Sequence, residues 1–129
     1  MPSSILLDTS VIIRHFRDVA ALSHRLASYE ELYIPGPALA ELYYGAYRSD
    51  RPRHHLDQIE KFLEAADVLT PDQETSHFYG KIAAQLAEEG KPIPQNDIWI
   101  AALSIQWGLP LATGDQHFQR IKNLQVLIW

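Results

Sequence analysis

The segment Ile5-Leu6-Leu7, followed at once by Asp8, limits most strongly what this chain can fold into. Three consecutive branched aliphatic residues predict a short strand that is buried on both faces, as strands of a parallel sheet are. A carboxylate directly after such a strand lies where open α/β sheets bind ligands, between the strand's carboxyl end and a helix. We therefore expect a parallel sheet that gathers Asp8 and other acidic residues at one edge.

Further apolar segments alternate with helical patterns along the rest of the chain. Strands are also predicted at 32–34, 68–69, 109–113 and 126–129. Helices are predicted at 11–26, 38–47, 54–66, 72–89 and 97–108, with Asn96 as the N-cap of the last one. Strands separated by helices throughout predict an α/β fold with a parallel sheet and right-handed crossovers.

The composition predicts a globular, cytoplasmic protein that does not enter a membrane. The 129 residues are 47% hydrophobic, which suffices for one domain with its own core. The absence of cysteine excludes disulfides, thiolate metal sites and cysteine nucleophiles, and no signal peptide or membrane-spanning run is visible. The net charge of −5 argues against coating nucleic acid by bulk attraction, but it is compatible with an enzyme whose acids hold a metal.

Four of the 16 acidic residues stand in apolar surroundings, namely Asp8, Glu41, Asp97 and Asp115. Each alone also has a structural explanation, such as a helix dipole, a turn or a cap. Together they are better explained by a site, because carboxylates gathered in a cleft raise each other's pKa unless a cation neutralises them. Oxygen ligands without cysteine suit Mg²⁺ or Mn²⁺ rather than zinc, and such an ion activates water for phosphodiester cleavage.

The order of four short motifs resembles the PIN-domain ribonucleases and, more narrowly, the VapC toxins of bacterial toxin–antitoxin pairs. The motifs are Asp8-Thr9-Ser10, Ala40-Glu41-Leu42, Asp97-Ile98-Trp99-Ile100-Ala101-Ala102 and Thr113-Gly114-Asp115-Gln116-His117-Phe118. The resemblance covers essentially the whole chain, so residues 1–129 are expected to form a single PIN domain. It implies a three-layer α/β/α sandwich with a central five-stranded parallel sheet. It also implies Mg²⁺- or Mn²⁺-dependent endonucleolytic cleavage of RNA, inhibition by a VapB-like antitoxin, and a homodimer.

The resemblance also implies roles for individual residues. The acids that would hold the metal and act in catalysis are Asp8, Glu41, Asp97 and Asp115. Ser10 belongs to the first motif as a supporting residue, and Thr113 is expected to orient Asp115 by hydrogen bonding. Phe118 is expected to pack rather than take part in chemistry. Asn96 stands where many relatives carry another acid, so no fifth carboxylate is expected there.

Basic residues gather in one turn, which contains Arg48, Arg51 and Arg53. This turn leaves the helix of Glu41, so it is a candidate contact for RNA phosphates, with a solvated loop as the structural alternative. Arg14, about two turns into the helix after Asp8, is a second candidate. The six histidines show no metal-ligand spacing and are expected to be surface or packing residues. His117 is the exception to watch, because it lies two residues after Asp115.

Two other functions compete with a metal-dependent ribonuclease. A phosphatase could use Asp8 as a nucleophile, but enzymes of the haloacid-dehalogenase type require a second Asp two residues later, where this chain has Ser10. A catalytically silent PIN-like binding module is the other alternative. The presence of all four acids counts against it.

Overall fold

The computed structural model describes residues 3–129 and contains a five-stranded sheet in the order β3-β2-β1-β4-β5. The strands are β1 (Ser4–Leu7), β2 (Glu31–Pro35), β3 (Ala66–Leu69), β4 (Leu111–Thr113) and β5 (Val126–Ile128). Each of the four pairings between neighbouring strands is parallel. The predicted α/β class with a central five-stranded parallel sheet is therefore confirmed.

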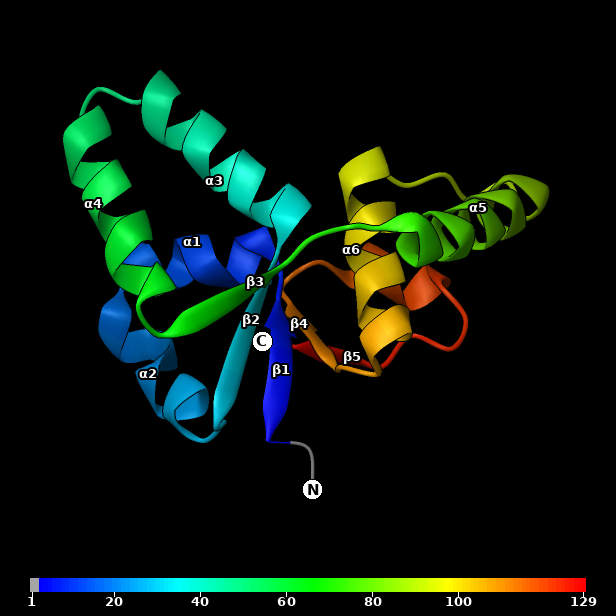
Figure 1. Cartoon of the computed structure of the whole chain (residues 1–129), viewed down its shortest axis with the longest axis horizontal. Helices are drawn as coiled ribbons and strands as arrows, with labels where there is room; N and C mark the ends of the chain where they lie inside the picture. Colours follow the sequence, from blue (N-terminus) through cyan, green and yellow to red (C-terminus); the bar gives the residue numbers. More distant parts are fainter. Residues whose placement is uncertain (1–2) are drawn as a thin grey trace.

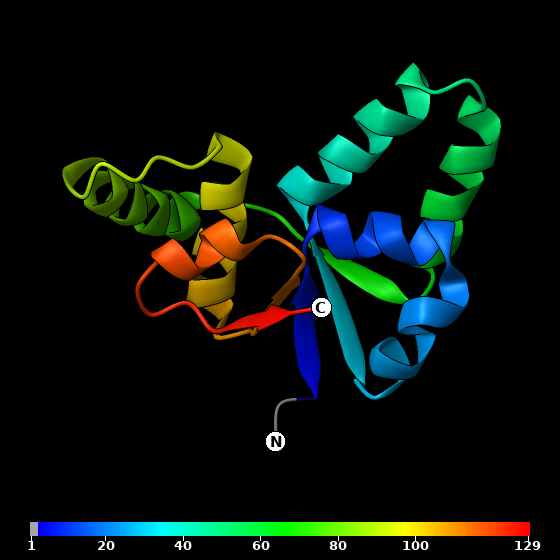
Figure 2. The ribbon, with the colours of Figure 1, turned by 180° about the vertical axis from the view of Figure 1, so that it is seen from behind.

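Six α-helices and one 3₁₀ segment connect the strands. They are α1 (Thr9–Arg17), α2 (Val19–Ala27), α3 (Gly36–Arg48), α4 (Pro52–Leu63), α5 (Gln73–Glu88), α6 (Gln95–Trp107) and η1 (Gln116–Arg120). Helices α1 to α4 lie on one side of the sheet, and α5 and α6 lie on the other (Figures 1 and 2). This is the expected three-layer arrangement. Within residues 3–129, no helix combines the length and apolar character needed to cross a bilayer.

Two local predictions were wrong. The helix predicted at 11–26 is broken at Asp18, whose backbone angles of φ −146° and ψ 89° are not helical, so α1 and α2 are separate. Asn96 is not the N-cap of α6, because that helix already begins at Gln95 and its N-cap position is Pro94. The Asn96 side-chain amide instead donates to Glu41 Oε1 at 3.2 Å.

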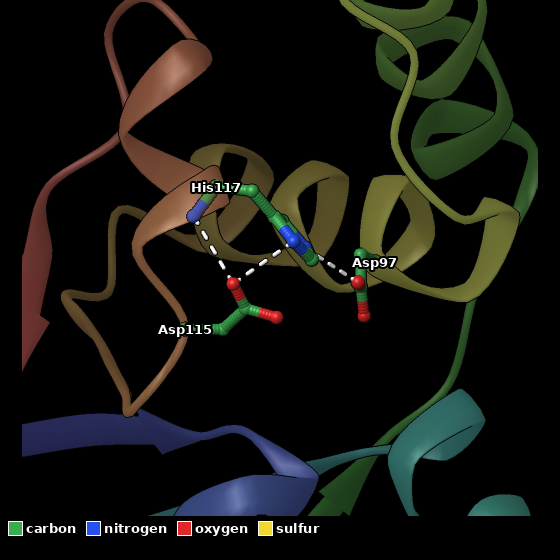
Figure 3. A group of neighbouring side chains, drawn as sticks. All are labelled: Asp97, Asp115 and His117. Carbon is green, nitrogen blue, oxygen red and sulfur yellow. Dashed lines mark hydrogen bonds and ion pairs between the residues drawn. The ribbon is translucent and has the colours of Figure 1, made fainter.

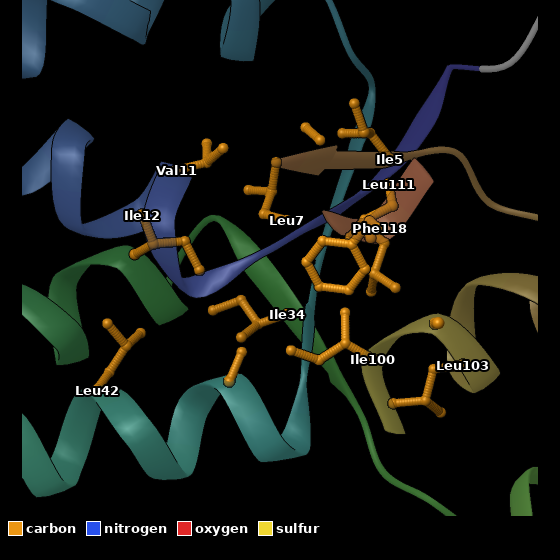
Figure 4. Packing of buried hydrophobic residues seen from close by; sticks show 14 of the residues in the cluster. Ile5, Leu7, Val11, Ile12, Ile34, Leu42, Ile100, Leu103, Leu111 and Phe118 are labelled. Carbon is orange, nitrogen blue, oxygen red and sulfur yellow. The ribbon is translucent and has the colours of Figure 1, made fainter. Parts of the chain in front are cut away.

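Strand β1 lies at the centre of the sheet and is buried on both faces. Ile5, Leu6 and Leu7 are all 0% exposed, as the run of branched aliphatic residues predicted. Figure 4 shows Phe118 packed among Ile5 and Leu7 of β1, Leu111 of β4 and Ile100 of α6. Burying each such side chain stabilises the fold by roughly 1.5–3 kcal/mol, so the position of β1 is strongly determined.

The carboxyl ends of β1 and β4 lie side by side and define the edge where the acids meet. Leu7 pairs with Ala112, and the Asp8 backbone N–H donates to the Ala112 carbonyl at 3.0 Å. Asp8 therefore stands beside the segment Thr113–Asp115. Helices α1 and α3 begin at this edge, directly after β1 and β2.

Candidate metal centre

Asp8 is the most buried of the four acids, with 5% of its surface exposed. It occupies the position before α1 in an extended conformation, but its side chain does not cap the helix. Its Oδ2 atom instead accepts hydrogen bonds from Thr113 Oγ1 at 2.7 Å and from Ser10 Oγ at 2.9 Å. Both hydroxyls bond to the same oxygen, which leaves Oδ1 for a further partner.

Thr113 connects two of the acids from a fully buried position. Its Oγ1 atom donates to Asp8 and accepts a hydrogen bond from the Asp115 backbone N–H at 3.0 Å. Thr113 was expected to orient Asp115, and in the structure its hydroxyl contacts only the backbone of Asp115. The carboxylate that Thr113 orients is that of Asp8.

Asp97, Asp115 and His117 form a compact group of potential metal ligands (Figure 3). One ligand atom from each residue lies within 4.8 Å of the other two. His117 stands between the carboxylates, with Nε2 at 2.7 Å from Asp97 Oδ2 and Nδ1 at 2.9 Å from Asp115 Oδ1. Asp97 lies in the first turn of α6, whereas Asp115 and His117 lie at the start of η1. Two segments, the first turn of α6 and the start of η1 after β4, thus converge on one point.

The charge of Asp97 is poorly compensated in the absence of a cation. Burial raises the pKa of Asp97, and the negative charges of Asp8 and Asp115 raise it further. The hydrogen bond from His117 lowers this pKa, but it does not reverse the effect of burial. A bound divalent cation would favour the ionised carboxylate, so the electrostatics of the cluster fit a metal.

Glu41 lies near these residues, but it is not part of the group of three that could bind one ion with one ligand atom each. It lies on α3 and is held by the side-chain amide of Asn96. Burial raises the pKa of Glu41, the hydrogen bond from Asn96 lowers it, and the charges of Asp97 and Asp8 raise it. Its carboxylate is thus close enough to Asp97 and Asp8 for their negative charges to affect its pKa.

The donor set differs in one respect from the all-oxygen set expected from the sequence. His117 adds a ring nitrogen to the group. From the sequence, a surface or packing role was the expectation for the histidines, with His117 as the exception to watch. The signal available was its position two residues after Asp115, which a tight turn brings back onto the same site. Asp115 Oδ1 accepts the His117 backbone N–H at 3.1 Å and forms this turn. Phe118, the next residue, is fully buried, as expected.

The basic residues do not join the acids. Arg48, Arg51 and Arg53 are exposed around the turn between α3 and α4, which lies at the far end of that helical hairpin (Figure 1). Arg48 is seven residues beyond Glu41, about 10 Å along the helix at 1.5 Å per residue. Arg53 lies 3.8 Å from Asp57 Oδ1. Contact with RNA at this turn remains a prediction.

Comparison with known proteins decides the family. Residues 5–124 match the PIN domain family. This chain belongs to the PIN domain family. It is 32% identical over 127 residues to ribonuclease VapC2 of Haemophilus influenzae, an alignment that covers 96% of each protein. It is 31% identical over 127 residues, again 96% of each, to a tRNA(fMet)-specific endonuclease VapC of Shigella flexneri.

The PIN fold of this chain is also that of solved VapC proteins. The structure of VapBC-1 from nontypeable Haemophilus influenzae superposes with a TM-score of 0.89 at 31% identity, over 98% of each chain. Within the PIN family, the chain therefore belongs with the VapC ribonucleases. This membership removes the phosphatase alternative that Asp8 raised.

Proposed function

We propose that this chain is the toxin of a toxin–antitoxin pair, a metal-dependent endoribonuclease that hydrolyses RNA phosphodiester bonds. The observation that carries the proposal is the convergence of Asp97, Asp115 and His117 beside the buried Asp8. This arrangement occurs in a chain that belongs with the VapC ribonucleases. We treat residues 1–129 as one PIN domain that acts in the cytoplasm, where RNA is available.

Mg²⁺ or Mn²⁺ is the proposed cofactor. Asp97 and Asp115 supply carboxylate oxygens at one point, and Asp8 Oδ1 and Glu41 complete the proposed set of four acids. Carboxylates favour Mg²⁺ and Mn²⁺, and the nitrogen of His117 is better tolerated by Mn²⁺. When bound, such an ion lowers the pKa of water and stabilises the charge that develops on phosphate oxygens.

The side chains supply orientation and proton transfer. Thr113 and Ser10 hold the Asp8 carboxylate in one rotamer. The entropy cost of orienting this side chain is therefore met on folding and not during the reaction. Attack by water forms one phosphorus–oxygen bond and breaks the bond to a ribose oxygen. The water loses one proton, and the ribose oxygen that leaves takes up a proton from solvent. Glu41 is the proposed acceptor of the proton that the water loses, because its carboxylate lies near Asp8 and Asp97 but outside the group formed by Asp97, Asp115 and His117.

A transfer RNA is the substrate to test first. Two relatives are named tRNA(fMet)-specific endonucleases, from Shigella flexneri and Salmonella typhimurium. The former aligns with 96% of this chain. A structured RNA would also explain how an acidic protein finds its substrate, because shape and a few phosphate contacts can replace bulk attraction.

A VapB-like antitoxin is the proposed partner, and the toxin is proposed to form a homodimer. The solved relatives include VapBC-1 from Haemophilus influenzae and DNA-bound VapBC complexes from Rickettsia felis and Salmonella typhimurium. Co-expression with a candidate VapB-like protein and size-exclusion chromatography test both expectations. A toxin that stays active in the presence of that partner would contradict this part of the proposal.

The cleavage experiment uses the purified chain with total RNA and with isolated tRNA. We expect specific fragments with Mg²⁺ or Mn²⁺, none in EDTA, and none with Asp8→Asn or Asp97→Asn. Glu88→Gln is the matched control, because Glu88 is an exposed acid at the end of α5 and makes no contact with the cluster. Undiminished cleavage in EDTA would refute the metal mechanism. No cleavage of any RNA with either ion would favour a silent PIN-like binding module.

A further inference from the structure

Trp129 follows β5 and bonds to the segment that carries two of the site residues. Its backbone N–H donates to the Thr113 carbonyl at 2.9 Å. Its own carbonyl accepts a hydrogen bond from Arg14 Nη1 at 2.7 Å. Arg14 lies on α1, about one turn beyond Ser10, and α1 begins directly after Asp8. A chain of hydrogen bonds thus joins the helix that follows Asp8 to the end of β4 through Trp129.

Ser10 provides a second link between the same two segments. Its Oγ atom accepts a hydrogen bond from the Gly114 backbone N–H at 3.0 Å and donates to Asp8 Oδ2. Ser10 and Trp129 both flank Gly114, since a Cβ atom on it would be in ordinary van der Waals contact with Ser10 Oγ at 3.6 Å and with the Trp129 carbonyl oxygen at 3.8 Å. The segment Thr113–Asp115 is therefore held by α1 directly and by α1 through Trp129.

The Trp129 ring is itself anchored away from the acids. The Arg25 guanidinium lies 5.5 Å from the ring centroid, and the Tyr29 ring lies 6.1 Å away at an angle of 41°. Arg25 belongs to α2, and Tyr29 precedes β2. In Figures 1 and 2 the end of β5 points towards the side of the sheet that α1 and α2 occupy. These contacts restrict the backbone of Trp129, which is the part that bonds to Thr113.

We propose that Arg14 and Trp129 are positioning residues that hold the segment Thr113–Asp115 against Asp8, and that Arg14 serves this role instead of binding RNA phosphate. The guanidinium is a charged donor, and a charged donor strengthens its bond to the carbonyl. Loss of either residue removes no acid, but it lets the segment that carries Asp115 move relative to Asp8. The inference goes beyond the proposed function and relies on it only for the cleavage measurement.

The test compares Arg14→Ala and Trp129→Ala with Arg17→Ala, which removes the same charge from an exposed position on the same helix. Amide hydrogen exchange of Gly114 and Asp115 is measured by NMR in EDTA. We expect exchange to be about tenfold faster in the first two variants, because the bonds to Ser10 and Thr113 open locally. Exchange at Leu6, which bonds to the Pro110 carbonyl, should not change in any variant.

Cleavage kinetics provide the second measurement. A small displacement of a reacting group is costly, so kcat should fall about tenfold in Arg14→Ala while KM stays within about twofold. Arg14→Lys keeps a charged donor and should recover part of the loss. Trp129→Phe keeps an aromatic ring for Arg25 and Tyr29 and should behave like the wild type. Arg17→Ala should match the wild type in every measurement.

Two results would overturn the proposal. Unchanged exchange at Gly114 and Asp115 in Arg14→Ala would show that the residue does not position the segment. A raised KM and a shallower salt dependence with unchanged kcat would identify Arg14 as an RNA contact. If Trp129→Ala does not fold, Arg14→Ala alone decides. If the wild type cleaves no RNA, the proposed function fails, whereas the exchange measurement still tests the positioning role.

Discussion

Thr113→Val is the smallest change that separates Asp8 from the hydroxyl that orients it. Valine has nearly the shape of threonine but lacks Oγ1, so packing around this fully buried residue is kept. The substitution removes the donor to Asp8 Oδ2 at 2.7 Å and the acceptor for the Asp115 N–H at 3.0 Å. Its effect therefore measures what the hydroxyl contributes.

The magnitude follows from these two bonds. A hydrogen bond to a charged group contributes about 1.5–3 kcal/mol, and a bond between neutral groups contributes about 0.5–1.5 kcal/mol. Ser10 Oγ still donates to Asp8 Oδ2 in the variant, so the expected loss of stability lies in the lower half of the range obtained by adding the two contributions. We expect the free energy of unfolding to fall by about 2–3 kcal/mol, and the melting temperature by roughly 6–10 °C for a domain of this size. Because the Asp8 carboxylate then keeps only one of its two hydroxyl donors, kcat should also fall by roughly 100-fold, with little change in KM.

The assay is thermal unfolding in EDTA together with cleavage kinetics well below the melting temperature. Thr113→Ser is the matched control, because it keeps the hydroxyl and loses one methyl group. That control should cost about 1 kcal/mol and leave kcat within a few-fold of the wild type. Equal stability and equal kcat in the two variants would refute the role assigned to Thr113 Oγ1.

Three further predictions concern charge. In metal-free protein, Asp97→Asn should raise the melting temperature, and the increase should grow as pH rises. Burial raises the pKa of Asp97 above its ordinary 3.8. The folded wild type therefore loses stability as pH rises through the raised pKa, whereas the variant does not. Melting curves in EDTA across a pH series check this, and a difference that does not grow with pH would contradict it. Burial lowers the pKa of His15 below its ordinary 6.5. The free energy of unfolding should therefore fall as pH falls from 6.5 through the lowered pKa, which denaturant titrations across a pH series measure. A His15→Leu variant that shows the same fall would exclude His15 as its cause. Replacing Arg51 and Arg53 with Ala in the inactive Asp8→Asn protein should weaken RNA binding and reduce the log–log salt slope by about one unit, whereas identical slopes would mean that this exposed turn does not bind phosphate.

The local elements were largely predictable because their patterns report burial directly. The run Ile5-Leu6-Leu7 predicted a strand covered on both faces, and it forms one. The break at Asp18 was not predictable from periodicity, since apolar residues continue at helical spacing on both sides of it. The start of α6 was missed for a related reason, because Asn96 is a strong N-cap residue whose side chain bonds to Glu41 instead.

The sequence by itself determined the α/β class, the edge of the sheet at which the acids lie and the family of the chain, because these depend on residue types in local order. Only the tertiary structure decided how the site residues are paired. It placed His117 between Asp97 and Asp115, directed Thr113 to Asp8 across 105 positions, and directed Arg14 to Trp129 across 115. Such pairs arise from the register of β1 with β4 and of β4 with β5. No local periodicity encodes that register, so the partners of a polar side chain follow from the fold and not from its neighbours in the chain.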